Sequence, residues 1–285
     1  VEQAPRRILS QQVERLSKYG IEARMASELE FFLFQKSYTE AHQTGYRELE
    51  PYYHIHGDWD VLIGGYAESF IRAIRNELSN ANIEIEGYQG EGAPGQYEIN
   101  IPPASPVKMA DKHAIFKHVV KSVAHEIGCA ASFMAKVNSR VAGSSCHVHI
   151  SLSKDKGESF GEAPAKFEES FIAGLLKFSP ELTILHAPYE NSYRRLRPET
   201  FAPCNVSWGW DNRTVMVRLI RQSKRMRIEF RLPGADVNPY LCFAAILAAG
   251  IEGIDRKLTL PPAIQGNAYK SDVSNEYIEV TLPSD

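Results

Sequence analysis

Residues 25–34, MASELEFFLF, are the stretch that decides how this chain folds. Alternate side chains of a β-strand point to opposite faces, so Glu28 and Glu30 share one face. The apolar neighbours favour the other face, although Phe32 and Phe34 interrupt the alternation. Two carboxylates at this spacing on so apolar a strand repel each other and resist desolvation unless a cation or several donors lie between them. The stretch therefore predicts a strand with a metal on its polar face.

The same pairing of ionisable residues recurs in two later strand-like segments. His147 and His149 alternate in CHVHISL, and Glu229 and Arg231 alternate in RIEFRL. A single pair of this kind is more typical of a solvated edge strand. Three pairs in three apolar segments favour one shared polar site.

Composition and charge exclude several classes of protein. The 285 residues are 44% hydrophobic and 24% charged, which is ordinary for a globular chain with one large domain or two small ones. The net charge of −3 gives no basic field, so neither nucleic acid nor an anionic membrane is an expected partner. Because no apolar segment has membrane length and no secretory leader opens the sequence, it predicts a cytoplasmic location. The four cysteines lack CxxC spacing and are expected to be reduced core thiols.

Hydrophobic periodicity predicts five helices. They cover residues 5–19, 66–81, 106–127, 167–178 and a last segment that begins at Asn238 and Pro239 and runs to 254. The polar and aromatic region 35–65 is expected to be a packed excursion, and its His54 and His56 are left unassigned.

A glycine-rich stretch separates two further carboxylates. Four glycines between residues 87 and 95 exclude a regular element, so a sharp turn is expected between Glu91 and Glu98. Such a turn brings both carboxylates to one point, although a glycine-rich hairpin without a functional role would have the same composition.

Cations concentrate between residues 194 and 231, where nine arginines and Lys224 occur. Arg213, Arg218, Arg227 and Arg231 lie in strand-like runs beside apolar residues, which argues against a solvated face. Arginines held near carboxylates suit the recognition of phosphate or carboxylate groups.

The candidate metal ligands are five carboxylates and one imidazole, namely Glu28, Glu30, Glu91, Glu98, His147 and Glu229. Hard oxygen ligands with one histidine suit Mg²⁺ or Mn²⁺, whereas zinc and iron–sulfur sites prefer more nitrogen or sulfur. This many negative charges require two or more cations. A pair of divalent ions beside several arginines is typical of phosphoryl transfer, in which positioning and charge neutralisation do most of the catalysis.

Seven ordered motifs carry a family resemblance, namely ELEFF, EGAPGQYE, SSCHVHISL, NSYRRL, APCNVSWGWDNR, RIEFR and NPYLCFAAILAAGIEGI. Together they cover about residues 5–260, and the chain resembles the catalytic domain of the glutamine synthetase superfamily. The resemblance implies an α+β fold in which a curved, mainly antiparallel sheet lines the active site and helices lie outside. It also implies that 1–285 is this catalytic domain, with the smaller N-terminal β-grasp domain expected before Val1 and the C-terminal end cut short.

The resemblance assigns roles to residues that match the family's motifs. It implies that Glu30, Glu91 and Glu98 hold one metal and that Glu28, His147 and Glu229 hold the other. The implied groups around the glutamate carboxylate and the transferred phosphate are Arg195, Arg213, Arg231 and Gly143, with Phe201 beside them. The implied ATP-binding positions are Glu86, His149, Ser151, Arg213, Arg218, Lys224 and Arg227.

The reaction implied is an ATP-dependent ligation, in which glutamate forms a γ-glutamyl phosphate and an amine then displaces phosphate. Two departures bear on the amine. Phe201 stands where the family's flap glutamate helps to deprotonate ammonium, and Ala142 stands where the family has asparagine. An apolar ring cannot accept a proton but can line a path for a carbon-bearing amine. Glu199, two residues away, is a possible substitute for the missing carboxylate.

These departures favour a γ-glutamyl ligase that uses a polyamine or monoamine. The alternatives are a true glutamine synthetase that uses ammonia, a phosphotransferase that makes no amide, and a non-catalytic assembly protein with the same fold. The six candidate ligands argue against a non-catalytic protein, because a site that has lost its chemistry has no reason to keep a group of charges that is so costly to bury. The resemblance also implies a ring-shaped homo-oligomer when the N-terminal domain is present.

Overall fold

The fold is built around one long strand, β1 (Ile21–Phe34). The computed structural model describes residues 1–55, 57–154, 157–158, 163–222, 225–270 and 282. In the sheet, the strands β2 (Gly87–Gly90), β3 (Gln96–Asn100), β1, β5 (Cys146–Lys154), β9 (Arg225–Phe230), β8 (Val217–Gln222) and β7 (Trp208–Trp210) lie side by side in that order. Two short strands, β4 (Ala130–Ser132) and β6 (Gly157–Glu158), pair with β1 and β5. Every pairing except β7 with β8 is antiparallel, which confirms the predicted fold class.

The strand register brings the predicted ligands next to one another. Glu28 on β1 lies opposite His147 on β5, and Glu30 lies opposite Glu98 on β3. On the other edge of β5, His149 lies opposite Glu229 on β9. Side chains of directly opposed residues lie about 5 Å apart at their Cβ atoms, so four adjacent strands contribute to one polar face.

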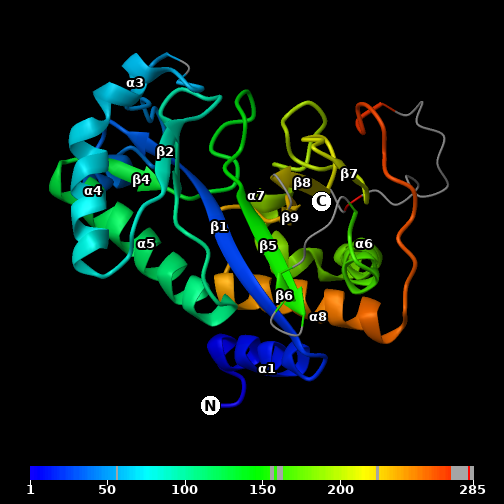
Figure 1. Cartoon of the computed structure of the whole chain (residues 1–285). Helices are drawn as coiled ribbons and strands as arrows, with labels where there is room; N and C mark the ends of the chain where they lie inside the picture. Colours follow the sequence, from blue (N-terminus) through cyan, green and yellow to red (C-terminus); the bar gives the residue numbers. More distant parts are fainter. Residues whose placement is uncertain (56, 155–156, 159–162, 223–224, 271–281, 283–285) are drawn as a thin grey trace.

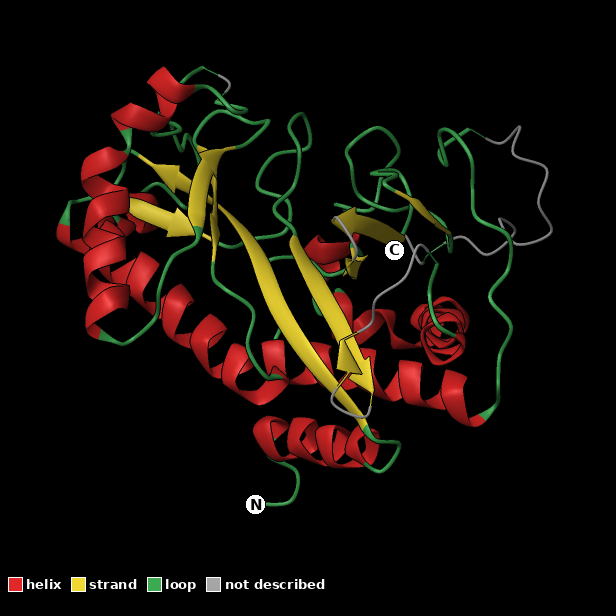
Figure 2. Ribbon diagram, in the orientation of Figure 1, coloured by secondary structure: helices red, strands yellow, loops and turns green. Residues whose placement is uncertain are grey.

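Helices make up most of the rest of the regular structure. Within the described residues they are α1 (Pro5–Ser17), α2 (Tyr38–Gln43), α3 (Val61–Tyr66), α4 (Glu68–Asn80), α5 (Pro106–Glu126), α6 (Lys166–His186), α7 (Glu190–Tyr193) and α8 (Pro239–Asp255). Figures 1 and 2 show α1, α5 and α8 below the long strands β1 and β5, with the loops gathered at the opposite end of the view. None of the helices in the described parts of the chain is both long and apolar enough to cross a membrane.

The two faces of β1 pack differently, which explains the imperfect alternation in its sequence. Phe31 is fully buried in the main core, where its ring lies 6.2 Å from that of Phe70 and 5.5 Å from that of Phe133. Phe32 and Phe34 point to the polar face, stack at 6.1 Å and form a small separate cluster with Ala93. The apolar residues on the polar face are therefore a second, local core.

Helix boundaries agree with the sequence except in α6. The prediction ended this helix at residue 178, but α6 continues through Pro180 to His186. Proline removes one backbone hydrogen bond, and the buried Thr183 and His186 beyond it show that tertiary packing outweighs this loss.

Helices α6 and α8 cross at two glycines. A Cβ atom on Gly253 would lie 2.8 Å from the Cα atom of Gly174 and closer still to the carbonyl oxygen of Ser170. This close approach buries the last helix, α8, whose first turn is capped by Asn238 as predicted. All four cysteines are free, and Cys129, Cys146 and Cys242 are buried.

Candidate active site

A cleft of about 630 Å³ lies over the polar face of the sheet. Its walls come from the strand ends, from the 57–60 and 139–143 segments and from the 195–201 loop. Fourteen of the residues predicted from the sequence line it, namely Glu28, Glu30, Glu91, Glu98, Gly143, His147, His149, Arg195, Phe201, Arg213, Arg218, Arg227, Glu229 and Arg231. The structure thus brings both the carboxylates and the arginines to one place, while their individual roles stay predictions.

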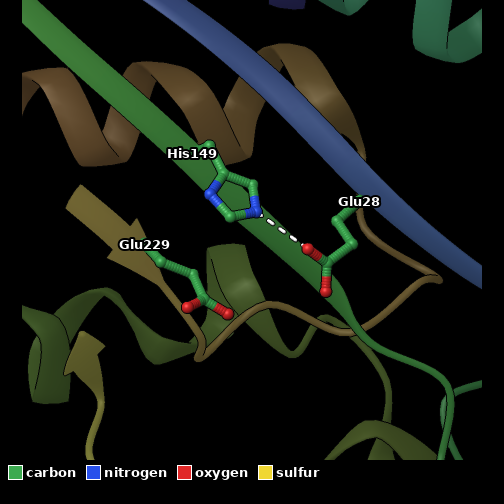
Figure 3. A group of neighbouring side chains, drawn as sticks. All are labelled: Glu28, His149 and Glu229. Atoms are coloured by element: carbon green, nitrogen blue, oxygen red, sulfur yellow. Dashed lines mark hydrogen bonds and ion pairs between the residues drawn. The ribbon is translucent and has the colours of Figure 1, made fainter. Parts of the chain in front are cut away.

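Glu28 is the centre of a carboxylate–histidine group. Nδ1 of His147 donates to one oxygen at 2.7 Å, and Nε2 of His149 donates to the other at 2.8 Å. Figure 3 shows the second contact, with Glu229 beside it. Burial alone would raise the pKa of Glu28, but the two histidines outweigh it and hold the pKa well below its usual range.

His149 was expected at the nucleotide, yet its ring contacts Glu28. Nε of Arg227 donates to Nδ1 of His149 at 3.3 Å, which leaves Nε2 to carry the proton donated to Glu28. Ligand atoms of Glu28, His149 and Glu229 all lie within 4.8 Å of one another, and so do those of Glu28, Glu30 and His147. The structure therefore brings candidate ligands together around Glu28, and His147 also lies 3.5 Å from Glu229. Which of these residues share an ion stays a prediction.

Glu30 is held by two neutral groups that were not singled out in the sequence. It accepts hydrogen bonds from the backbone N–H of Ser145 at 3.0 Å, from the Ser145 hydroxyl and from Nε2 of Gln96 at 2.9 Å. Burial and the nearby Glu91 charge nevertheless raise the pKa of Glu30 to about 8. Ser145 precedes His147 by two and Gln96 precedes Glu98 by two, so strand alternation could have identified both.

The β2–β3 hairpin confirms the predicted turn. Gly95 adopts a left-handed φ of 72°, and the backbone N–H of Glu91 donates to the carbonyl of Gln96 at 3.0 Å. The turn brings Glu91 and Glu98 close enough for their carboxyl groups to interact. Burial, followed by the charges of neighbouring carboxylates, raises the pKa of Glu98 to about 10. Burial likewise raises the pKa of Glu91.

Glu229 joins the carboxylate cluster to the arginines. It is 1% exposed, accepts from Nη1 of Arg218 at 3.0 Å and pairs with Nη1 of Arg231. Burial opposes ionisation, but the charges of Arg231 and His147 lower the pKa of Glu229. Arg218 also pairs with Asp211, so its guanidinium is fixed from both sides.

Two buried arginines border the end of the cleft near Gly143. Arg195 and Arg231 are each 3% exposed, and Arg195 donates to the carbonyl of Leu232. Gly143 has no room for a side chain, since a Cβ atom would lie 2.6 Å from Cγ of Arg195. Nε of Gln96 donates to the Gly143 carbonyl at 3.1 Å, which ties this loop to the carboxylates. This end of the cleft is thus lined by two buried cations and closely packed around Gly143.

The loop that follows Arg195 carries the unusual aromatic residue. Phe201 is 62% exposed, has a left-handed φ of 58°, and its carbonyl accepts from Nη2 of Arg231 at 3.1 Å. Glu199 has a φ of 59° and also lines the cleft. Arg213 is exposed at the same wall.

Three predicted nucleotide-binding residues are not among those that line the described cleft. Glu86 and Ser151 are exposed, and Lys224 lies outside the described residues. His54 is exposed and does not line the cleft either, while His56 is also outside the described residues. Conversely, Asp58, Trp59, Asn100, Lys136 and Arg197 line the cleft without having been predicted.

The donor set fits hard divalent cations. The neighbouring carboxylates Glu30, Glu91 and Glu98 have raised pKa values because each is buried close to other carboxylates, and a cation between them would offset that repulsion. Oxygen ligands with histidine are the donors that Mg²⁺ and Mn²⁺ accept. Those carboxylates, with Glu28, Glu229 and one or both histidines, are therefore the residues that could hold metal.

Comparison with known proteins identifies the family. The family described as the catalytic domain of glutamine synthetase matches residues 2–285. The chain belongs to this family. Glutamine synthetase catalytic domains have the architecture described above, and a solved structure of GmaS as an ADP complex superposes with a TM-score of 0.85. That structure is 30% identical and covers 99% of this chain and 66% of its own.

Relatives in the glutamine synthetase family include amine ligases. Gamma-glutamylethanolamide synthetase GlnA4 of Streptomyces coelicolor is 41% identical over 95% of this chain and 59% of its own length. Glutamate–isopropylamine ligase of a Pseudomonas species is 36% identical over 94% of this chain and 60% of its own length. Glutamine synthetase of Thermus thermophilus is 38% identical over 94% of this chain and 60% of its own length. The chain spans about three fifths of the length of these relatives.

Proposed function

We propose that this protein is an ATP-dependent ligase that joins the γ-carboxylate of glutamate to an organic amine. The observation that carries the proposal is Phe201, which presents an exposed ring to the cleft at the position of the family's flap glutamate. The names of two relatives, an ethanolamide synthetase and an isopropylamine ligase, support it. The ADP complex of GmaS supports a nucleotide as one of the substrates.

In the first step, a γ-carboxylate oxygen of glutamate attacks the γ-phosphorus of ATP and the bond to ADP breaks. Arg195 and Arg231 hold the glutamate carboxylate or the transferred phosphate by charge-assisted hydrogen bonds, and Gly143 leaves room for the Arg195 side chain. Arg213, Arg218 and Arg227 neutralise charge on the ATP phosphates. Because Arg218 and Arg231 are already fixed by Glu229, little reorganisation is needed.

In the second step, the amine nitrogen attacks the acyl carbon, the bond to phosphate breaks and the amine loses a proton. The ring of Phe201 cannot accept that proton. Oε of Glu199, which lines the cleft on the same loop, is the candidate acceptor. In this proposal Phe201 contacts the carbon atoms of the amine, and Glu199 accepts its proton.

Two or more Mg²⁺ or Mn²⁺ ions complete the proposed site. Glu28, Glu30, Glu91, Glu98, His147 and Glu229 would hold them, with His149 available beside Glu28. When bound, the ions neutralise phosphate charge and polarise the reacting oxygens. Glu86, Ser151 and Lys224 remain predicted nucleotide contacts on the resemblance alone.

The oligomeric state, the additional domain and the cellular location are part of the same proposal. We infer a catalytic domain that works in a ring-shaped homo-oligomer with a β-grasp domain, as the family resemblance implies. The free cysteines agree with the predicted cytoplasmic location, because reducing compartments keep thiols unpaired.

Phosphate release from ATP tests the proposal. The full-length protein is assayed with glutamate and Mg²⁺, with ammonium compared against ethanolamine, isopropylamine and a polyamine. Preference for an organic amine supports the role of Phe201. Preference for ammonium would favour the second candidate, a glutamine synthetase in which Glu199 replaces the flap carboxylate. A phosphorylated product without amide indicates a phosphotransferase, and no ATP-dependent chemistry indicates an assembly protein.

A further inference from the structure

Trp59 is an exposed tryptophan on the wall of the cleft with an unusual backbone. It is 68% exposed, and its φ of 56° lies in the left-handed region. Bulky residues seldom adopt this conformation, which persists where the surroundings enforce it, often at ligand sites. Neither the family motifs nor the proposed mechanism uses this residue.

The segment that carries Trp59 is fixed against the hairpin. Asp58 forms a parallel bridge with Gly90, and the N–H of Asp60 donates to the carbonyl of Gly57 at 3.0 Å. A Cβ atom on Gly90 would lie 2.8 Å from the carbonyl carbon of Gly57, so the two backbones meet where only glycine fits. Trp59 therefore has a set position next to Glu91, the residue that follows Gly90.

This position borders the proposed glutamate end of the cleft. Gln96 joins the hairpin to the Gly143 loop. Its carbonyl accepts from the N–H of Glu91, and its side-chain amide donates to the carbonyl of Gly143. Trp59 and Asp58 thus line the same cleft as Gly143 and Arg195, on the segment that adjoins the hairpin carrying Glu91.

The charge and chemistry of this wall select for an organic cation. Asp58 bridges Gly90, the residue before Glu91, and lines the cleft together with Trp59. A carboxylate beside an exposed indole attracts an alkylammonium ion, because the ring face binds the cation and packs against its carbon atoms. Ammonium has no carbon to pack.

We propose that Trp59 and Asp58 bind the acceptor amine, with the indole against its carbon chain and the Asp58 carboxylate near its nitrogen. They set the preference for a primary alkylammonium ion over ammonium. This inference rests on the proposed function and deepens it by naming a second determinant of the amine besides Phe201.

The test is a Trp59→Asn variant of the full-length protein, because asparagine tolerates the left-handed backbone and lacks the indole. Tyr46→Asn is the matched control, since Tyr46 has a φ of 59°, is 66% exposed and does not line the described cleft. For each protein, kcat/KM is measured for isopropylamine and for ammonium by phosphate release. Quenching of tryptophan fluorescence by isopropylammonium measures binding without turnover.

We expect Trp59→Asn to lower the ratio of isopropylamine to ammonium kcat/KM at least fivefold, mainly through KM, and Tyr46→Asn to change it less than twofold. If Trp59→Asn lowers kcat/KM equally for isopropylamine and ammonium, or leaves both unchanged, the inference is overturned. If wild type uses ammonium only, the organic-amine function and this inference fall together. If the wild-type protein ligates no amine, the proposed function fails. Fluorescence quenching by isopropylammonium that is lost in Trp59→Asn would then still support the binding site. No such Trp59-dependent quenching would overturn it.

Discussion

The narrow space at Gly143 predicts a large effect from a single methyl group. In a Gly143→Ala variant the new Cβ atom would lie 2.6 Å from Cγ of Arg195 and closer still to the carbonyl oxygen of Ala135. Ordinary contact begins at 3.4 Å, so the Arg195 side chain or the loop has to retreat by about 0.8 Å. Arg195 cannot turn aside freely, because it is 3% exposed and bonded to the Leu232 carbonyl.

A displacement near 1 Å in a positioning group can lower a rate about a hundredfold, or about 2.7 kcal/mol in transition-state binding. We therefore expect Gly143→Ala to reduce kcat/KM for glutamate by about two orders of magnitude. Overpacking should also reduce the free energy of unfolding by about 1–3 kcal/mol. Phosphate release at saturating ATP and amine measures the first quantity, and urea denaturation measures the second.

Gly87→Ala is the control, because a Cβ atom there meets nothing within 4 Å and Gly87 does not line the cleft. It should keep kcat/KM for glutamate near the wild-type value. A folded Gly143→Ala protein with kcat/KM within threefold of wild type would refute the assignment of Gly143 and Arg195 to the glutamate pocket.

Three further predictions concern the buried charges and the core. Glu229→Ala leaves Arg218 and Arg231 without their buried partner, so we expect a loss of about 3–5 kcal/mol in urea denaturation and no Mg²⁺-dependent ATP binding by calorimetry. Burial lowers the pKa of Lys117 from 10.5 to about 8. Between pH 8 and 10.5 the unfolded chain therefore binds more protons at Lys117 than the folded chain. The free energy of unfolding, measured by urea denaturation, should rise with pH across this window by at most about 3 kcal/mol, and Lys117→Met should remove the rise. Gly253→Ala forces α6 and α8 apart and should lower the midpoint of thermal unfolding, since about 1–3 kcal/mol is lost to overpacking; an unchanged midpoint would contradict the described helix crossing.

The regular elements were predictable because their signals are local. Alternation around Glu28 and Glu30 located β1, and the apolar stripe that ends at Gly128 located α5. The limits of this approach appear at Pro180, which predicts the end of a helix that tertiary packing continues.

The site was predictable in composition and less so in arrangement. Residue types and motifs selected the charged groups, but which carboxylate a histidine contacts depends on strand register, which the sequence does not specify. His149 therefore lies on Glu28 rather than only at the nucleotide. Trp59 escaped prediction because its conformation is imposed by distant contact with Gly90, and neither alternation nor helical spacing reveals such a contact.

The order of strands in the sheet also fixes when the site can exist. Glu28 and Glu229 are about 200 residues apart in the chain, and they meet only because β5 pairs with β1 on one edge and with β9 on the other. During synthesis, a chain that has emerged only as far as β5 already holds Glu28 and His147 but has neither Glu229 nor the arginines that neutralise the cluster. The complete cluster therefore depends on β5 having paired with both of its neighbours, so it exists only in a sheet that holds all three strands.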